Sequence, residues 1–276
     1  MENDTLAKYQ AFKALHDETF VMPNPWDAGT ARILTALGYK ALATTSAGYA
    51  FSQGKKDSAR CLSRDDILAN ARAIVQATDL PVSADLENGF GDAPETCAET
   101  IRAAIEAGLV GGSIEDATGN TATPIYDFGH AVERVTAAVE AARDLPFMVT
   151  ARAENFLHGH PDLDDTIKRL QAFEAAGADV LYAPGLPDLA AIRTVCAAVH
   201  KPVNVMMGLS GPNITVDALR AAGVKRISVG GSFARAALGG FMRAAQEVLE
   251  TGSFEYAHEA LPDAVASGFM ASGPAK

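Results

Sequence analysis

The chain has 276 residues, of which 48% are hydrophobic and 21% charged, and its formal net charge is −11. These values are typical of a globular protein with a sizeable core. The negative charge argues against nucleic acid or an anionic membrane surface as a partner.

Cysteine content and hydropathy predict a cellular compartment. The three cysteines are odd in number and lack metal-ligand spacing, which favours a reducing compartment over a disulfide framework. The first residues, MENDT, are acidic and polar, and no run of 18 apolar residues occurs. The sequence therefore predicts neither a secretory signal nor a membrane-spanning helix, and we expect a cytoplasmic protein.

Eight short apolar segments alternate with amphipathic stretches along the chain. In order, they lie at 19–23, 39–44, 80–84, 108–114, 145–149, 177–182, 201–205 and 223–229. Four of them follow a predicted helix that ends in glycine, the usual left-handed cap. Eight alternating strand–helix units predict the α/β class and, at this length, a closed (β/α)8 TIM barrel.

We expect one barrel domain over residues 1–276, with a short C-terminal extension from about residue 253. An open, doubly wound sheet is the alternative architecture. It is disfavoured because NPWDAGT at 24–30, rather than Gly-x-Gly-x-x-Gly, follows the first apolar segment.

Acidic residues follow three successive apolar segments, where the predicted strands end. They are Asp85 and Glu87 after the third segment, Glu115 and Asp116 after the fourth, and Glu154, together with Arg152, after the fifth. Because the active sites of TIM barrels lie at the carboxyl ends of the strands, we expect these side chains to converge. Clustered carboxylates need a cation, and their oxygens suit Mg²⁺, with Mn²⁺ as the alternative. The competing interpretation is that each acid separately caps a helix.

Other polar residues at the same predicted face suit a carboxylate ligand. Arg152 is a charged fork for a carboxylate or phosphonate, and its alternative role is an internal salt bridge to Glu154 or Glu115. The turn at 44–48 offers backbone N–H groups and hydroxyls. Asn204 lies in the seventh segment, whereas the histidines at 158 and 160 are interpreted as polar loop surface.

At these residues the chain resembles the isocitrate lyase/phosphoenolpyruvate mutase superfamily, from Asn24 to about Gly252. The resemblance is carried by TTSAG at 44–48, Asp57, DLENGFG at 85–91, IED at 114–116 and ARAENF at 151–156. It implies a Mg²⁺-dependent barrel that binds 2-oxo acids and stabilises enolate-like intermediates.

The resemblance also implies roles for individual residues. Asp85 would hold the metal, with Asp57, Glu87 and Glu115 around it, mostly through water. The substrate carboxylate would be bound by the backbone of Ser46 and Ala47 and by the side chains of Thr45 and Arg152. We take Arg152 and Glu115 as the predicted catalytic residues and Asn204 as a further substrate-binding residue.

The loop at 117–130 departs from the pattern of the superfamily. Lyases of the group carry Lys-x-Cys-Gly-His there, with the Cys as general acid, but this loop has neither Cys nor Lys. Phosphonomutases use a Lys and an Asn-Ser pair, for which only Asn120 and Thr121 are approximate substitutes. The segment GGSF at 230–233 lacks the His of the group's oxaloacetate decarboxylases. Cleavage of isocitrate or methylisocitrate by the usual route is therefore not expected.

Four residues are left as candidates for proton transfer: Tyr126, Asp127, His130 and Tyr182. We expect a Mg²⁺-dependent lyase or decarboxylase that acts on a small 2-oxo or 2-hydroxy mono- or dicarboxylate through an enolate. The alternatives are a phosphoenolpyruvate mutase or phosphonopyruvate hydrolase, and a 2-oxo acid binding protein without catalysis. The expected partner is a small carboxylate, with no nucleic acid and no membrane.

The predicted eighth helix, from about 232 to 249, carries apolar residues around much of its circumference. This pattern indicates burial on more than one side. The superfamily resemblance implies the same, because its members often exchange the eighth helix between subunits. We expect a homo-oligomer, a dimer of dimers in preference to a dimer, with residues 232–265 at the interface.

Overall fold

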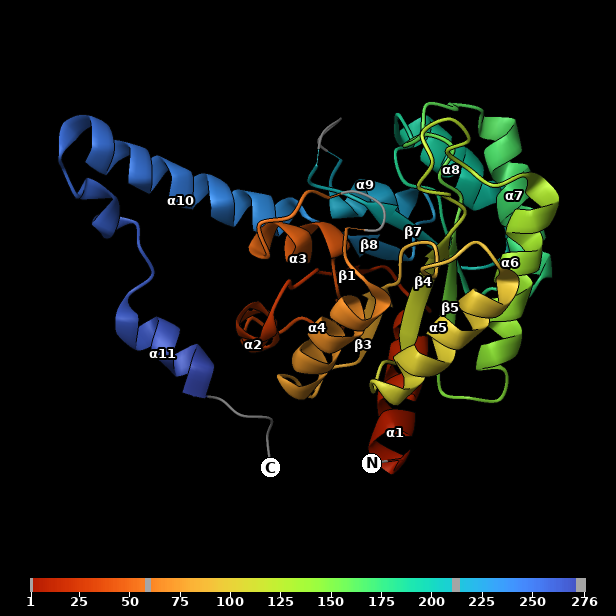
Figure 1. The fold of residues 1–276 in the computed structure, drawn as a ribbon, viewed down its shortest axis with the longest axis horizontal. Coiled ribbons are helices and arrows are strands. Elements are labelled where there is room, and N and C mark those ends of the chain that lie inside the picture. The colour runs from red at the N-terminus through yellow and green to blue at the C-terminus, as the bar shows by residue number, and fades with distance from the viewer. Residues whose placement is uncertain (1, 58–60, 210–213, 272–276) are drawn as a thin grey trace.

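The computed structural model describes residues 2–57, 61–209 and 214–271. Eight parallel strands form its centre, and helices surround them (Figure 1). The strands are β1 Phe20–Met22, β2 Leu42–Ala43, β3 Val82–Asp85, β4 Gly111–Glu115, β5 Met148–Arg152, β6 Val180–Tyr182, β7 Val203–Met206 and β8 Arg226–Ser228. Every predicted strand is therefore confirmed.

The sheet runs β1-β8-β7-β6-β5-β4-β3-β2, so that β1 and β2 are its two ends. The backbone N–H of Ala43 donates to the carbonyl of Pro23 at 3.0 Å and brings these ends together. The result is a nearly closed (β/α)8 barrel, as the sequence predicts, rather than an open doubly wound sheet.

The helices between the strands begin at polar caps, with one exception. They are α2 Ala28–Ala36, α3 Ser46–Ser52, α4 Arg64–Gln76, α5 Pro94–Glu106, α6 Phe128–Ala142, α7 Leu163–Ala175, α8 Leu189–Ala198 and α9 Val216–Ala221. The exception is α5, which follows Ala93 and begins with Pro94. Side chains of Asp or Ser accept the first free N–H groups of α4, α7 and α8. The repeated glycines at 38, 108, 177 and 223 all have positive φ just after a helix, as expected for left-handed caps.

The amino-terminal end of the barrel is closed by α1, Glu2–Leu15. Its Phe12 is fully buried and packs with inward-facing strand residues that include Met22, Val110 and Val180. Gly111 makes room for it, because a Cβ there would lie 3.0 Å from the Phe12 ring. With this end filled, the interior is accessible from the carboxyl ends of the strands.

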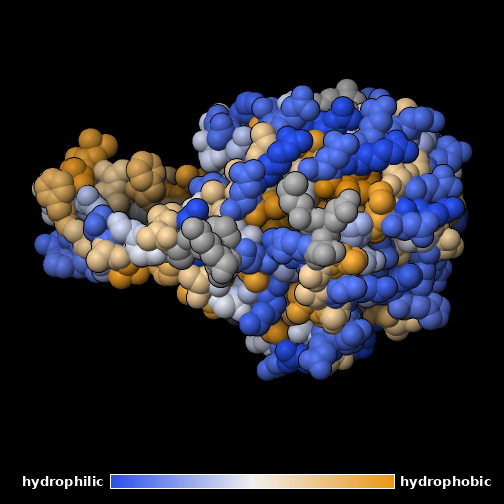
Figure 2. Space-filling model, turned by 90° about the horizontal axis from the view of Figure 1, so that it is seen from below, coloured by the Kyte–Doolittle hydropathy of each residue, from blue (hydrophilic) through white to orange (hydrophobic). Residues whose placement is uncertain are grey.

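The chain ends in a C-terminal arm, residues 232–271, which leaves the barrel (Figure 1). It comprises α10 Ser232–Thr251, a 3-10 turn Glu255–His258 and α11 Asp263–Ala271, which returns to pack on α2. Large apolar side chains are exposed along it, with Phe241 73% and Leu249 86% exposed. Figure 2 shows hydrophobic surface on the projecting part of the molecule. The residues after Ala271, which end the C-terminal extension expected from about residue 253, lie outside the described residues.

Within the described ranges, no helix is both long and apolar enough to cross a membrane.

Candidate active site

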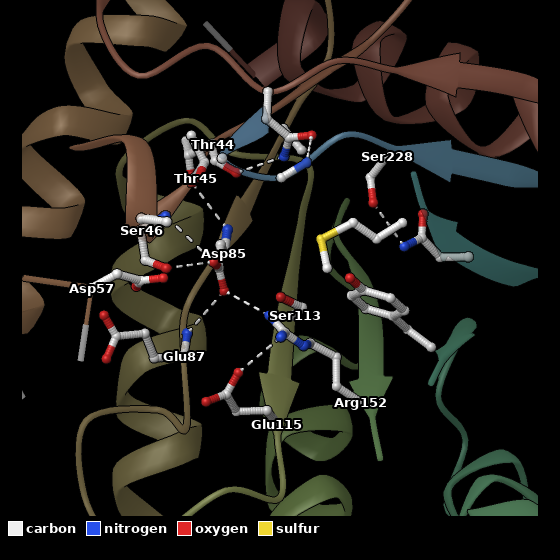
Figure 3. A pocket seen from close by; sticks show the side chains of 18 of the residues that line it. Thr44, Thr45, Ser46, Asp57, Asp85, Glu87, Ser113, Glu115, Arg152 and Ser228 are labelled. Carbon is white, nitrogen blue, oxygen red and sulfur yellow. Dashed lines mark hydrogen bonds and ion pairs between the residues drawn. The ribbon is translucent and has the colours of Figure 1, made fainter. Parts of the chain in front are cut away.

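A cavity of about 540 Å³ lies at the carboxyl ends of the strands, where a barrel builds its chemistry. The predicted site residues that line it are Thr45, Ser46, Ala47, Asp57, Asp85, Glu87, Glu115, Arg152 and Asn204 (Figure 3). Their convergence follows from the fold, because β2, β3, β4, β5 and β7 all end at the same face. We call this cavity the site pocket.

Arg152 is at the centre of the acidic groups. It extends from the end of β5, and its Nη1 lies 3.1 Å from Asp85, its Nη2 3.3 Å from Glu115 and its Nε 2.8 Å from Glu154. Arg152 therefore lines the site pocket and also forms the internal salt bridges to Glu115 and Glu154 that were its alternative role. Burial lowers the pKa of Arg152, but the carboxylates outweigh it and raise this pKa, so the guanidinium stays charged.

Asp85 joins Arg152 to the turn after β2. Its Oδ2 accepts hydrogen bonds from the Ser46 hydroxyl at 2.8 Å and the Ser46 backbone N–H at 3.4 Å, while Oδ1 faces Arg152. The Asp85 backbone N–H donates to Thr44 Oγ1 at 3.0 Å. Thr45 caps α3 by accepting from the Gly48 N–H. The turn therefore positions Asp85 through several hydrogen bonds.

The loop after β3 is held in a strained shape. Glu87 and Phe90 have φ of 47° and 65°, in the left-handed region that non-glycine residues rarely adopt. Arg134 of α6 is buried and donates to the backbone carbonyls of Asn88, Gly91 and Asp92. This clamp fixes the loop that carries Glu87 into the pocket.

The acids in the pocket raise one another's proton affinity. Burial is the main cause that raises the pKa of Glu115; Arg152 opposes it, and Glu154, Asp85 and Glu87 raise it further. Asp57, exposed at the mouth, has its pKa raised by desolvation and by the charge of Asp85. The single positive charge of Arg152 therefore does not neutralise this group of carboxylates. A bound cation would compensate the remaining negative charge.

The donor chemistry of the pocket fits a hard cation. Among the described residues, no group of three or more His, Cys, Asp or Glu side chains is close enough to hold a metal directly. Mg²⁺ commonly keeps several waters and takes only one or two carboxylates, so Asp85 with water-mediated neighbours satisfies its preference. The oxygen atoms of the pocket therefore suit Mg²⁺, although the described residues do not supply a complete set of direct protein ligands.

Three of the four candidate proton donors are engaged outside the site pocket. The Tyr126 hydroxyl donates to Asp92 at 2.7 Å, Asp127 caps α6, and His130 Nε2 lies 2.8 Å from the carbonyl of Asp92. Only Tyr182, at the end of β6, lines the pocket. The Arg152 guanidinium lies over its ring at 4.9 Å.

Asp116 does not reach the pocket, although it belongs to the predicted acidic cluster. Its Oδ1 accepts the backbone N–H of Glu154 at 2.8 Å, and its Oδ2 faces Arg169 at 2.9 Å. Asp116 therefore supports Glu154 from behind. Adjacent residues at the end of a strand point in opposite directions, so Glu115 faces the pocket while Asp116 lies behind it, and this alternation was the signal that could have separated the two roles.

Several pocket residues are absent from the sequence-based prediction. Arg226 and Ser228 of β8 line the cavity, as do His158 and Arg235. The alternation Arg-x-Ser in β8 was the available signal, because it interrupts an apolar strand with inward-facing polar residues. His158 lines the site pocket as well, which corrects its interpretation as loop surface.

Asn204 lies in the pocket, but both ends of its amide are engaged. Its Nδ2 donates to Ser228 Oγ at 3.0 Å, and its Oδ1 accepts from Arg226 Nε at 2.9 Å. One N–H of the amide has no hydrogen-bond partner among the described residues and could donate to a substrate without breaking either of these bonds.

Comparison with known proteins shows the family of the chain. The family model for phosphoenolpyruvate phosphomutase matches residues 12–249. The 2-methylisocitrate lyase of Escherichia coli K12 is 31% identical over 206 residues, covering 72% of this chain and 69% of its own length.

Two solved structures from Burkholderia cenocepacia J2315 are similar over most of the chain. A putative lyase/mutase has 56% identity and a TM-score of 0.95, covering 98% of both chains. A putative phosphonomutase has 36% identity and a TM-score of 0.77, covering 87% of this chain and 99% of its own. Relatives named 2-methylisocitrate lyase, oxaloacetate decarboxylase and 2,3-dimethylmalate lyase support a lyase-type activity on small carboxylates. Together with the barrel and its acidic pocket, they show that the chain belongs to the phosphoenolpyruvate phosphomutase family, within the isocitrate lyase/phosphoenolpyruvate mutase superfamily of carbon–carbon lyases and mutases.

Proposed function

We propose that this protein is a Mg²⁺-dependent lyase or decarboxylase that acts on a small 2-oxo or 2-hydroxy carboxylate through an enolate. The observation that carries the proposal is the position of Asp85, held between Ser46 and Arg152 in a pocket that also receives Glu87 and Glu115. This combines a hard-cation ligand set with a fixed positive charge. The three cysteines are unpaired, which agrees with a cytoplasmic location.

In this proposal the chain's own residues orient the substrate. Arg152 and the backbone N–H groups of Ser46 and Ala47 bind its carboxylate. Glu115 and Glu154 hold the Arg152 fork in place through ion pairs at 3.3 and 2.8 Å. When bound near Asp85, Mg²⁺ supplies a Lewis acid for the 2-oxo or 2-hydroxy oxygen.

Tyr182 is the proposed proton donor in the pocket. Burial raises the pKa of its hydroxyl, against the opposing effect of Arg152, so the hydroxyl stays protonated at neutral pH. A buried, protonated hydroxyl beside Arg152 is placed to stabilise negative charge that develops on the substrate.

Phosphorus–carbon chemistry, as a phosphoenolpyruvate mutase or phosphonopyruvate hydrolase, is the second candidate. It is favoured by the family model and by the similarity to a putative phosphonomutase. It is disfavoured by the loop at 117–130, which has no lysine to face a phosphoryl group. We therefore rank it below carbon–carbon cleavage.

The test is incubation of the protein with Mg²⁺ and a panel of 2-oxo acids, 2-hydroxy acids and phosphonates, followed by ¹H and ³¹P NMR. We expect Mg²⁺-dependent loss of one carboxylate with a new carbon–carbon cleavage or decarboxylation product. New ³¹P resonances with unchanged carboxylates would select the second candidate. Tight binding of 2-oxo acids without turnover of any compound would identify a binding protein and overturn the proposal.

A further inference from the structure

Arg226 is a buried cation whose surroundings differ from those of the other buried arginines in the described chain. Arg152 and Arg169 face carboxylates, and Arg134 faces three backbone carbonyls. Arg226 is only 3% exposed, and its hydrogen-bond partners are the neutral side chains of Asn204 and Thr150. Burial lowers the pKa of Arg226 to about 9, which still leaves it charged at neutral pH.

The side chain of Arg226 lies inside the barrel, below the acidic mouth of the site pocket. Residue 227, between Arg226 and Ser228, packs in an outer hydrophobic cluster, so residues 226 and 228 face inward. From β8 the guanidinium crosses the interior to β5, where Nη2 donates to Thr150 Oγ1 at 3.0 Å. Arg226 lines the site pocket, and its buried Nη1 has no hydrogen-bond partner.

The opposite wall of the barrel leaves space for a ligand near this depth. Below Asp85 and Glu115, the inward-facing residues of β2, β3 and β4 that line the pocket are small: Ala43, Ser83 and Ser113. Two of them carry hydroxyls, and large side chains there would have filled the interior. The pocket is therefore continuous from the carboxylates at its mouth to a cation with an unused donor nitrogen at its inner end.

A buried charge with an unsatisfied donor is unfavourable unless a ligand compensates it. An anionic ligand suits the site best, because Arg226 can only donate hydrogen bonds and no described carboxylate is among its hydrogen-bond partners. A carboxylate suits the site better than a phosphonate, because the unused donors are one guanidinium nitrogen and neighbouring hydroxyls. Arg152 and the turn at 44–48 are already assigned to one carboxylate, so this would be a second one.

We propose that Arg226 binds the second carboxylate of the substrate and thereby selects dicarboxylates over monocarboxylates. This inference rests on the proposed function, since it places the first carboxylate at Arg152. It assigns the substrate to the short-chain 2-oxo or 2-hydroxy dicarboxylates. Asn204 becomes a positioning residue in this arrangement, because its amide oxygen orients the guanidinium through Nε.

The test compares malate with lactate, which differ in one carboxylate, by calorimetric titration in the presence and absence of Mg²⁺. The variants are Arg226→Met, Arg226→Lys and, as a control with the same change in charge, Arg143→Met on the exposed end of α6. We expect the unmodified protein and the control to bind malate at least about tenfold more tightly than lactate. Arg226→Met should lose at least about tenfold in malate affinity with lactate affinity kept within about twofold, and Arg226→Lys should be intermediate.

Other outcomes separate the two proposals. Mg²⁺-dependent lactate binding without a malate preference in the unmodified protein would overturn the role of Arg226 alone. Equal loss of both ligands in Arg226→Met would also overturn it and show that Arg226 only supports the barrel, with buried water at Nη1. The absence of Mg²⁺-dependent binding for both ligands in the unmodified protein would overturn the proposed function as well. If Arg226→Met does not fold, the malate preference of the unmodified protein and of Arg226→Lys decides the question.

Discussion

Asp85 and Arg152 show how one ion pair can serve both stability and binding. The pair is partly buried, with side-chain exposures of 21% and 12%, so removing one partner leaves an incompletely compensated charge. Arg152 also forms ion pairs with Glu115 and Glu154, so it keeps two acidic partners when Asp85 is removed. Asp85 is therefore the acid whose loss should affect cation binding most, with the arginine still held in place.

We expect Asp85→Ala to abolish Mg²⁺-dependent binding of oxalate, a mimic of an enolate, while the barrel stays folded. The physical reason is that no three His, Cys, Asp or Glu side chains of the described residues are grouped closely enough to hold the ion, so the loss of its proposed ligand Asp85 should not be compensated. Calorimetric titration of oxalate with and without Mg²⁺ measures this. Undiminished affinity in the variant would refute the assignment of Asp85.

A matched control is Asp188→Ala, which removes an aspartate that caps α8. Its loss should cost about 1 kcal/mol of stability, typical for a cap, with oxalate binding unchanged. Comparing the two variants separates the loss of a carboxylate in the pocket from the loss of a carboxylate elsewhere on the fold.

At the scale of elements, α1 places a histidine inside the barrel floor. His16 is 5% exposed, hydrogen-bonds through Nδ1 to the carbonyl of Phe12, and lies edge-on to the rings of Phe12 and Phe20. Burial, helped by the charge of Arg226, lowers the pKa of His16 from 6.5 to about 3. The folded chain therefore keeps His16 neutral where the unfolded chain takes up a proton.

This difference predicts a pH dependence of stability. Because the unfolded state binds more protons below its pKa of 6.5, stability should fall as the pH drops from 6.5 towards 3. Between about pH 7.5 and about pH 5.5 the loss from this group should be about 1.4 kcal/mol. Urea unfolding of the unmodified protein and of His16→Phe, which cannot titrate, measures it. Identical pH dependence in the two proteins would contradict the origin in His16.

The loop at 117–130 sets a limit on the chemistry of the pocket. It lacks Cys and Lys, and its Tyr126, Asp127 and His130 bind groups outside the pocket. General acid–base groups contribute about 10²–10⁴-fold to rates. We therefore expect isocitrate and methylisocitrate to be cleaved far below the usual enzyme rates of about 1–10³ s⁻¹. Coupled assays for glyoxylate release from isocitrate and for pyruvate release from methylisocitrate check this, and efficient release of either would show that another residue replaces the Cys.

At the scale of the whole molecule, the C-terminal arm carries large apolar side chains that the described chain leaves exposed. Beyond its first turns, α10 leaves the barrel with Leu238, Phe241, Met242 and Leu249 exposed by 47 to 86%. Exposed apolar surface of this kind marks an interaction site, and a second copy of the chain fits a symmetric exchange of the arm.

We expect light scattering to give a multiple of the 28.8 kDa chain mass, a dimer or a dimer of dimers. Replacing Phe241 and Leu249 together by Glu should shift the mass towards the monomer, because both side chains would lie at the interface. Glu250→Gln, a conservative change at an exposed position of the same helix, is the control and should leave the mass unchanged. A clean monomer of the unmodified protein at micromolar concentration would count against the exchange of the arm.

The number and order of strands were predictable because their signals are local. Each apolar run is short, and four of them follow a glycine that must adopt positive φ at the end of a helix. The convergence of Asp85, Glu115 and Arg152 was predictable too, because parallel strands of a barrel end at one face. The direction of individual side chains was not predicted. The sequence pattern places Asp116 in the acidic cluster, but its side chain points away from the site pocket.

The sequence by itself determined the barrel, the acidic face and the family. These features depend on hydrophobic periodicity, helix caps and short motifs, which are local patterns of neighbouring residues. Only the tertiary structure decided that Tyr126, Asp127 and His130 face away, that Tyr182 faces in, and that Arg226 crosses the barrel to Thr150. These facts depend on contacts between residues as many as 76 positions apart, as between Arg226 and Thr150. Such contacts are set by how strands tilt and side chains fill a shared interior, and no local pattern in the chain encodes them.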